Sequence, residues 1–149
     1  MSVSVMLDTG PLGVLTRTKT NDETKRCRNW LRRLLRQRVT VLLPELADYE
    51  LRRELLRAKK SVRSLDRFGR ALTYLPLTTE GMRRAAEIWA DMRQIGMPTA
   101  GDKELDGDVI LCAQALTYQA EKRESVVVAT MNVGHISRMT QAALWTDIG

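Results

Sequence analysis

The sequence predicts an α/β fold, a three-layer α/β/α sandwich with a central and mainly parallel sheet. Short Val-rich apolar segments alternate along the chain with segments whose apolar residues recur at the helical period. In addition, the helix expected from Asp108 is apolar nearly all round, which is typical of a helix packed at the centre of such a fold. No repeat, low-complexity tract or linker interrupts this pattern, so we expect a single domain over residues 1–149.

The predicted strands are short apolar segments bounded by turn-forming residues. "VSVML" at residues 3–7 and "VTVLL" at 39–43 are rich in Val, as is "SVVVAT" at 125–130. A further strand is expected around residues 74–77, and "AALWTDI" at 142–148 is a candidate for another. Because helical segments separate these strands, we expect them to run parallel with both faces of the sheet covered.

Helices are predicted between the strands from capping residues and apolar periodicity. A short helix begins at Pro11, Asn21 caps a longer one, and Pro44 opens the helix after the second strand. Residues 61–70 form a further helix, and Thr79 caps the next. The expected inward stripes of three of these helices are Cys27, Trp30, Leu31, Leu34 and Leu35; Ala47, Leu51, Leu55 and Ala58; and Met82, Ala85, Ala86, Trp89 and Met92.

The composition excludes several classes of protein. The chain is 44% hydrophobic and 28% charged, which is ordinary for a globular protein, and no apolar run approaches the roughly 20 residues that span a membrane. Since the start lacks a signal-peptide pattern, we expect a cytoplasmic protein with no membrane partner. Cys27 and Cys112 are interpreted as free buried thiols, and the single histidine, His135, as structural.

The net charge of +6 favours anionic partners, nucleic acid first. Basic residues concentrate in "TKRCRNWLRRLLRQR" at residues 24–38. This segment is either the solvated face of an amphipathic helix or a surface that contacts phosphates, and the sequence leaves both interpretations open.

Acidic residues crowd immediately ahead of the apolar helix. Gly96 and Pro98 end the preceding helix and predict a loop that runs to about Gly107. The acidic residues of this stretch are Asp102, Glu104, Asp106 and Asp108. We expect Asp102 and Glu104 to be solvated loop charges, and Asp108 to be presented by the start of the helix.

Other polar residues are expected at the same edge of the sheet, because sites in open parallel sheets form beyond the carboxyl ends of the strands. Asp8 directly follows the first strand, and Asn132 follows the Val-rich strand near the C-terminus. Glu50 lies in the first two turns of the helix after the second strand, and Asp106 and Asp108 begin the apolar helix. Four separate segments thus bring oxygen ligands together.

Oxygen ligands from carboxylates and an amide suit a hard cation, Mg²⁺ or Mn²⁺, rather than zinc. Carboxylates this close repel one another, so a cation explains why they occur together. Mg²⁺ held by few protein ligands keeps water molecules, one of which can attack a phosphodiester, while the basic surroundings hold the polyanion. The predicted metal ligands are Asp8, Glu50, Asp108 and Asp106.

Each of these residues also has an ordinary structural explanation. Asp8 can form a turn or cap the short helix after it, and Glu50 can form a surface ion pair. Asp106 or Asp108 can be an N-cap, and Asn132 can adopt a left-handed turn. The convergence of the residues on one edge, rather than any one of them, favours a site.

Four segments occur in the order and at the spacing seen in PIN domains. They are "MLDTGPL" at residues 6–12, "PELADYELRREL" at 44–55, "LDGDVILCAQAL" at 105–116 and "VVVATMN" at 126–132. Over nearly the whole chain, from Val3 to about Ile148, the sequence resembles this family. It is similar to the small single-domain members that include the VapC-type toxins of toxin–antitoxin pairs.

The resemblance implies a PIN-like sandwich that acts as a Mg²⁺- or Mn²⁺-dependent endoribonuclease. The family's first three acidic positions fall on Asp8, Glu50 and Asp108. The fourth, Asp in many members, is Asn132 here, and Thr130 would be a site-shaping hydroxyl. The resemblance further implies an RNA substrate, a homodimer, and a cognate antitoxin that inserts an arginine among the carboxylates.

Some assignments stay open at this point. Asn132 has one negative charge fewer than aspartate, which leaves one or two metal ions possible, and Asp106 is an additional acid that could replace part of the charge. Glu45 and Glu54 are alternatives to Glu50, because the assignment rests on spacing. Two other functions remain, a non-catalytic nucleic-acid-binding module and a different Mg²⁺-dependent phosphohydrolase.

Overall fold

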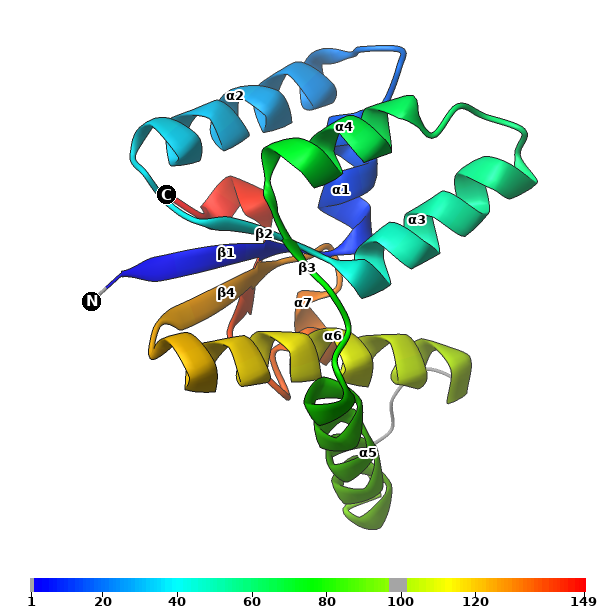
Figure 1. The fold of residues 1–149 in the computed structure, drawn as a ribbon, viewed down its shortest axis with the longest axis vertical. Coiled ribbons are helices and arrows are strands. Elements are labelled where there is room, and N and C mark those ends of the chain that lie inside the picture. The colour runs from blue at the N-terminus through cyan, green and yellow to red at the C-terminus, as the bar shows by residue number, and fades with distance from the viewer. Residues whose placement is uncertain (1, 97–101) are drawn as a thin grey trace.

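Five parallel strands form the centre of the structure, a computed structural model that describes residues 2–96 and 102–149, the side chains of 102–105 excepted (Figure 1). The strands follow the order β3-β2-β1-β4-β5, and every pairing is parallel. Their bounds are β1 (Val3–Leu7), β2 (Val41–Pro44), β3 (Thr73–Leu75), β4 (Ser125–Ala129) and β5 (Ala142–Ala143). The predicted α/β class with a parallel sheet is confirmed.

Helices cover both faces of this sheet (Figure 1). One face carries α1 (Thr9–Thr16), α2 (Asp22–Arg36), α3 (Glu45–Arg57) and α4 (Arg63–Ala71), with the 3-10 turn η1 (Trp145–Asp147) against α2. The other face carries α6 (Asp102–Lys122) and α7 (Val133–Ile136), and α5 (Thr79–Gln94) packs outside α6. Among these described helices none is long and apolar enough to cross a membrane.

The alternation of side chains along β1 divides the core into two parts. Val5 and Leu7 point to the first face and belong to a cluster that includes Trp30 of α2. Met6 points to the opposite face and belongs to a second cluster that includes Leu111 of α6. The central strand is therefore buried on both sides from Ser4 to Leu7, as its mostly apolar sequence predicts.

The second helix is largely as predicted. Asn21 is its N-cap, and its Oδ1 accepts a hydrogen bond of 2.9 Å from the Thr24 amide. Four residues of the expected stripe are buried, whereas Leu35 is 45% exposed. Leu34 already fills the position against the core, so the next residue along the helix turns towards solvent.

The start of α3 differs from the prediction by one residue. Pro44 is the last residue of β2 and the N-cap of α3, and the helix itself begins at Glu45. The strand predicted at 39–43 is observed as β2, at Val41–Pro44. Ala58, expected in the inward stripe, follows the end of the helix as its C-cap and is exposed.

The face that α5 buries was predicted only in part, since Ala85 and Met92 of the expected stripe are buried. Thr78 rather than Thr79 is the N-cap, and its Oγ1 accepts a hydrogen bond from the Gly81 amide at 2.9 Å. The buried residues of the helix are Gly81, Ala85, Ile88 and Met92, whereas Met82, Ala86 and Trp89 are exposed. The reason is tertiary: α5 packs on α6 instead of the sheet, so its apolar face is narrow and turned towards one helix.

The loop expected up to Gly107 is also wrong in its second half. Helix α6 begins at Asp102, and the residues 97–101 of the predicted loop lie outside the described part of the chain. A glycine inside a helix costs only about 1 kcal/mol relative to alanine, and the apolar packing further along α6 outweighs this cost. Gly107 is therefore an interior residue of the helix, and Asp102 is helical.

The packing of α6 on the sheet predicts a measurable difference between two leucines. Leu111 is 2% exposed, whereas Leu56 on α3 is 59% exposed. We expect Leu111→Ala to lower the free energy of unfolding by about 2–5 kcal/mol, because it removes buried contacts and leaves a cavity. Leu56→Ala, the matched control, is expected to change it by less than about 0.5 kcal/mol. Urea unfolding followed by circular dichroism measures both values, and equal values would contradict the packing described.

Candidate functional site

The carboxyl ends of β1 and β4 bring Asp8 and Thr130 side by side. Leu7 pairs with Ala129 in the sheet, so the next residue after each of the two strands leaves the sheet at the same level. The Thr130 hydroxyl donates a hydrogen bond of 2.7 Å to Asp8 Oδ2, and it accepts one of 2.9 Å from the Asn132 amide. Thr130 is fully buried, which fits its predicted role as a site-shaping hydroxyl.

A second hydroxyl joins Asp8 to Glu50. Asp8 is the N-cap of α1, where its Oδ1 accepts a hydrogen bond of 2.7 Å from the Thr9 amide. The helix therefore starts at Thr9 rather than at Pro11. The Thr9 hydroxyl donates a bond of 2.7 Å to Glu50 Oε1 of α3. Two neighbouring residues thus connect the carboxylates that follow β1 and β2.

The three candidate glutamates of α3 have different surroundings. Glu45 accepts a hydrogen bond of 2.7 Å from the Leu77 amide, beyond β3. Glu54 pairs with Arg57 on an exposed surface. Within the described residues, Glu50 is the one of the three that hydrogen-bonds to the segment containing Asp8. The geometry therefore favours Glu50 over its two alternatives.

Gly107 brings the start of α6 close to Glu50. A Cβ atom added at Gly107 would lie 2.8 Å from Glu50 Oε2, closer than real Cβ contacts allow. The glycine thus leaves the space that the Glu50 carboxylate occupies, one residue before Asp108. Sequence reasoning interpreted Gly107 as the end of a loop; a glycine within a helix beside acidic residues is the signal that points to this close approach.

Asp108 lies near His135 at the start of α7. Its Oδ2 is 3.8 Å from His135 Nδ1, and the two side chains are 20% and 32% exposed. His135 Nδ1 is buried and has no hydrogen-bond partner within the described part of the chain. The histidine was predicted to be structural, and the structure places it beside one of the candidate acids.

Cys112 lies one helical turn after Asp108. Burial raises the pKa of its thiol, and the negative charges of Asp108 and Asp8 raise it further. The charges of both carboxylates therefore act on the same buried sulfur. Burial also raises the pKa of Cys27 to about 12. Both cysteines are free and buried, as predicted.

The remaining candidates are more peripheral. Asp106 is exposed. Asn132 is exposed as well and begins α7 without a side-chain capping bond. Its φ of −110° excludes the left-handed turn that was the alternative explanation. Its hydrogen bond to the Thr130 hydroxyl comes from the backbone, so its side-chain amide is available to a ligand at this edge.

The basic segment at residues 24–38 forms α2 and has two kinds of arginine. Arg28 donates hydrogen bonds to the carbonyl oxygens of Leu15 and Arg17, so it fastens α2 to the end of α1. Arg32, Arg33 and Arg36 are exposed. The two interpretations of the segment as a whole therefore stay open, but Arg28 has a structural role.

The carboxylate oxygens at this edge suit a hard cation, although Asp8 and Glu50 are already connected to each other through hydrogen bonds to Thr9. Neither Asp8 nor Glu50 forms an ion pair within the described residues. In the same part of the chain, no group of three or more His, Cys, Asp and Glu residues is arranged to hold a metal ion. The oxygen donors of Asp8 and Glu50 nevertheless fit Mg²⁺ or Mn²⁺ in chemistry.

Comparison with known proteins shows similarity at the level of structure. No family model matches the sequence, and no curated protein matches it significantly. The chain superposes on a chain of VapBC2 from Rickettsia felis bound to a DNA fragment from their promoter, with 17% identity, a TM-score of 0.68 and coverage of 96% of this chain and 98% of that one. For FitAcB from Neisseria gonorrhoeae the identity is 19% and the TM-score 0.67, with coverage of 97% of this chain and 99% of that one. For DNA-bound VapBC from Salmonella typhimurium the identity is 20% and the TM-score 0.65, with coverage of 96% of this chain and 98% of that one.

The chain has a PIN-like fold. The superposition covers nearly the full length of both chains, and at these identities the likeness establishes the fold alone.

The Thr130 hydroxyl is expected to contribute to stability. In Thr130→Val the Asn132 amide loses its acceptor and Asp8 loses a donor at a fully buried position, which should lower the free energy of unfolding by about 1–3 kcal/mol. Thr130→Ser keeps the hydroxyl and is the matched control, with a smaller loss expected. Guanidinium unfolding of the two variants tests this, and equal losses would show that the hydrogen bonds contribute little.

Proposed function

We propose that the protein is a Mg²⁺- or Mn²⁺-dependent endoribonuclease that hydrolyses RNA phosphodiester bonds. The observation that carries the proposal is the linkage of Asp8 to Glu50 through Thr9 and to Thr130, beside Gly107, the residue before Asp108. Acidic side chains held close to one another suit a divalent cation. The basic composition of the chain suits a polyanionic substrate.

Each residue has a defined part in this proposal. Asp8, Glu50 and Asp108 would hold the cation, with Asp106 as an auxiliary acid and Asn132 orienting the attacking water. The cation, when bound, would supply a Lewis acid and lower the pKa of a water molecule. Water adds to phosphorus and the bond to the 3′-oxygen breaks, which leaves a 5′-phosphate and a 3′-hydroxyl.

The two threonine hydroxyls fix the orientation of the carboxylates. Thr9 and Thr130 each donate a short hydrogen bond of 2.7 Å, one to Glu50 and one to Asp8. Both threonines are tied to the backbone of a helix start or a strand end, so they position the acids before any ligand arrives. Their contribution is positional, since neither hydroxyl needs to touch the substrate.

The proposal predicts cleavage of mixed RNA that depends on Mg²⁺ or Mn²⁺. Asp8→Asn and Asp108→Ala are expected to reduce cleavage to the level seen with EDTA, because each removes a proposed cation ligand. Gel analysis of labelled RNA measures the rate, and circular dichroism checks that the variants are folded. An unchanged rate in folded Asp8→Asn protein would refute the assignment.

A set of three substitutions serves as the internal control. Glu50→Gln should lose most of the activity, whereas Glu54→Gln should keep it, because Glu54 pairs with Arg57 at the surface. Glu45→Gln should also keep it. RNA binding without cleavage at any Mn²⁺ concentration would instead favour a non-catalytic binding module, and cleavage of mononucleotides alone would favour another phosphohydrolase.

We also propose that the protein is a toxin with a cognate antitoxin. The support is the likeness of its fold to the VapBC and FitAcB structures. The carboxylates of Asp8 and Glu50, which are held by hydrogen bonds at the sheet edge, are a suitable target for an arginine of such a partner. A homodimer is part of the same proposal, and light scattering of the purified chain tests it.

An arginine-bearing antitoxin is expected to inhibit cleavage by occupying the acidic edge. A small DNA-binding protein encoded beside this chain should co-purify with it and suppress RNA cleavage. Substituting the partner's inserted arginine with alanine should restore cleavage while the complex remains intact. Full inhibition by the alanine variant would contradict direct insertion among the carboxylates.

A further inference from the structure

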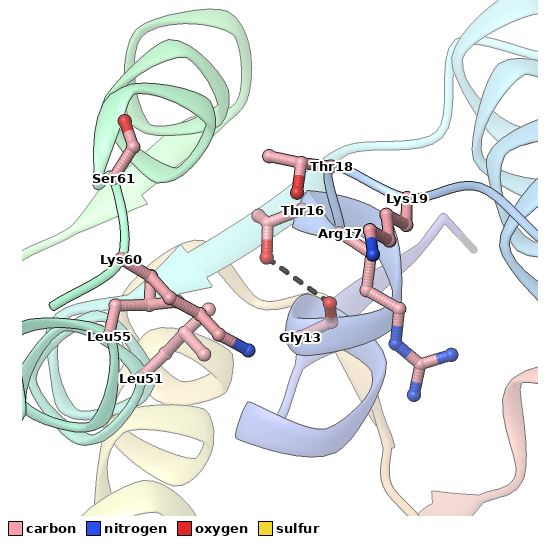
Figure 2. A pocket seen from close by; sticks show the side chains of 9 residues that line it. All are labelled: Gly13, Thr16, Arg17, Thr18, Lys19, Leu51, Leu55, Lys60 and Ser61. Carbon is pink, nitrogen blue, oxygen red and sulfur yellow. Dashed lines mark hydrogen bonds between the residues drawn. The ribbon is translucent and has the colours of Figure 1, made fainter. Parts of the chain in front are cut away.

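A cationic pocket lies at the far end of the contact between α1 and α3. It has a volume of about 650 Å³ and is lined by Gly13, Thr16, Arg17, Thr18, Lys19, Leu51, Leu55, Lys60 and Ser61 (Figure 2). Asp8, Glu50 and Asp108 do not line it, so it is separate from the acidic edge. Its volume is within the range of pockets that bind small ligands.

The pocket combines positive charge with an apolar wall. Figure 2 shows Lys60 on the α3 side and Lys19 on the α1 side, with Leu51 and Leu55 forming part of the wall from α3. Lys19 and Lys60 form no ion pair with any described residue, whereas Arg17 pairs with Glu23 at 2.8 Å. No acidic side chain is among the residues that line the pocket.

The pocket and the acidic edge lie along the same pair of helices. Thr9 and Glu50 join α1 to α3 beside Asp8, and Leu51, the residue after Glu50, lines the pocket. A Cβ atom at Gly13 would lie 3.8 Å from Leu51 Cδ1, so the two helices remain close between the two sites. The eight residues of α1 span roughly 12 Å. The pocket and the acidic edge are therefore a few nucleotides apart along a bound RNA strand.

An RNA strand at the acidic edge needs positive charge elsewhere on the protein. Carboxylates repel the phosphates that flank the cleaved bond, and contacts to the phosphate backbone supply most of the affinity for nucleic acids. Lys19 and Lys60 can contact one phosphate from two sides, while the leucines offer an apolar surface to the adjacent sugar or base. A cationic pocket on the same pair of helices meets this need.

We propose that this pocket binds a backbone phosphate and the adjacent nucleoside of the RNA substrate, a few nucleotides from the cleaved bond. This inference rests on the proposed ribonuclease function, to which it adds a second contact point on the strand. Lys19 and Lys60 are binding residues in it, and they have no part in the cleavage step.

RNA binding by the full-length Asp8→Asn protein in EDTA tests the pocket without cleavage. The probe is a fluorescein-labelled single-stranded RNA of roughly 12 nucleotides, within the range that strand-binding proteins cover. Lys19→Ala and Lys60→Ala should each weaken binding several-fold and reduce the slope of log K against log salt by about 0.7, the value for one phosphate contact on a single strand. Lys19→Arg and Lys60→Arg should retain the affinity, because they keep the charge.

Lys122→Ala is the matched control, because this exposed lysine ends α6, before β4, at the opposite edge of the sheet. RNA affinities of the pocket variants equal to that of the control would overturn the inference. A selective loss of affinity for a glutamate-rich peptide, with RNA binding unchanged, would overturn it in favour of a protein ligand. Lysine-dependent RNA binding by a wild-type protein that cleaves no RNA would support the pocket and refute the ribonuclease.

Discussion

The parallel pairing of β1 with β4 is the interaction on which the rest of the site depends. Its register places Leu7 beside Ala129, and this alone brings Asp8 within hydrogen-bond distance of Thr130. A slip of one residue would move every side chain of β1 to the opposite face, and Met6 would leave the cluster that it fills. Apolar packing on both faces of the strand therefore determines the position of a polar site that lies outside the core.

The polar contacts at the sheet edge hold like charges together without neutralising them. Asp8 accepts hydrogen bonds at both carboxylate oxygens, from the Thr9 amide and the Thr130 hydroxyl. Glu50 accepts the Thr9 hydroxyl and lies against a helix that lacks a side chain at Gly107. Such contacts orient carboxylates without forming an ion pair, whereas an arginine would both orient and neutralise them. This difference distinguishes the acidic edge from an ordinary surface ion-pair network.

Local patterns predicted the position of each strand and the ends of β1, because an apolar run followed by Asp8 is a signal within a few residues. They did not predict the exact ends of the later strands, the full buried face of α5 or the start of α6, because neighbouring elements decide these. Spacing favoured Glu50 but left Glu45 and Glu54 as alternatives, and the choice depends on a hydrogen bond to Thr9 across 41 residues. The approach of Gly107 to Glu50 and of His135 to Asp108 likewise joins segments that are far apart in the sequence.

The hydrogen bond between Asp8 and Thr130 spans 122 residues, which has a consequence for the order of events during synthesis. Asp8 leaves the ribosome 122 residues before its partner. A nascent or truncated chain that lacks β4 has neither the central strand pairing nor the buried hydroxyl that orients Asp8. The acidic edge therefore forms only after β4 has been made, and products of the same messenger that stop before β4 lack it.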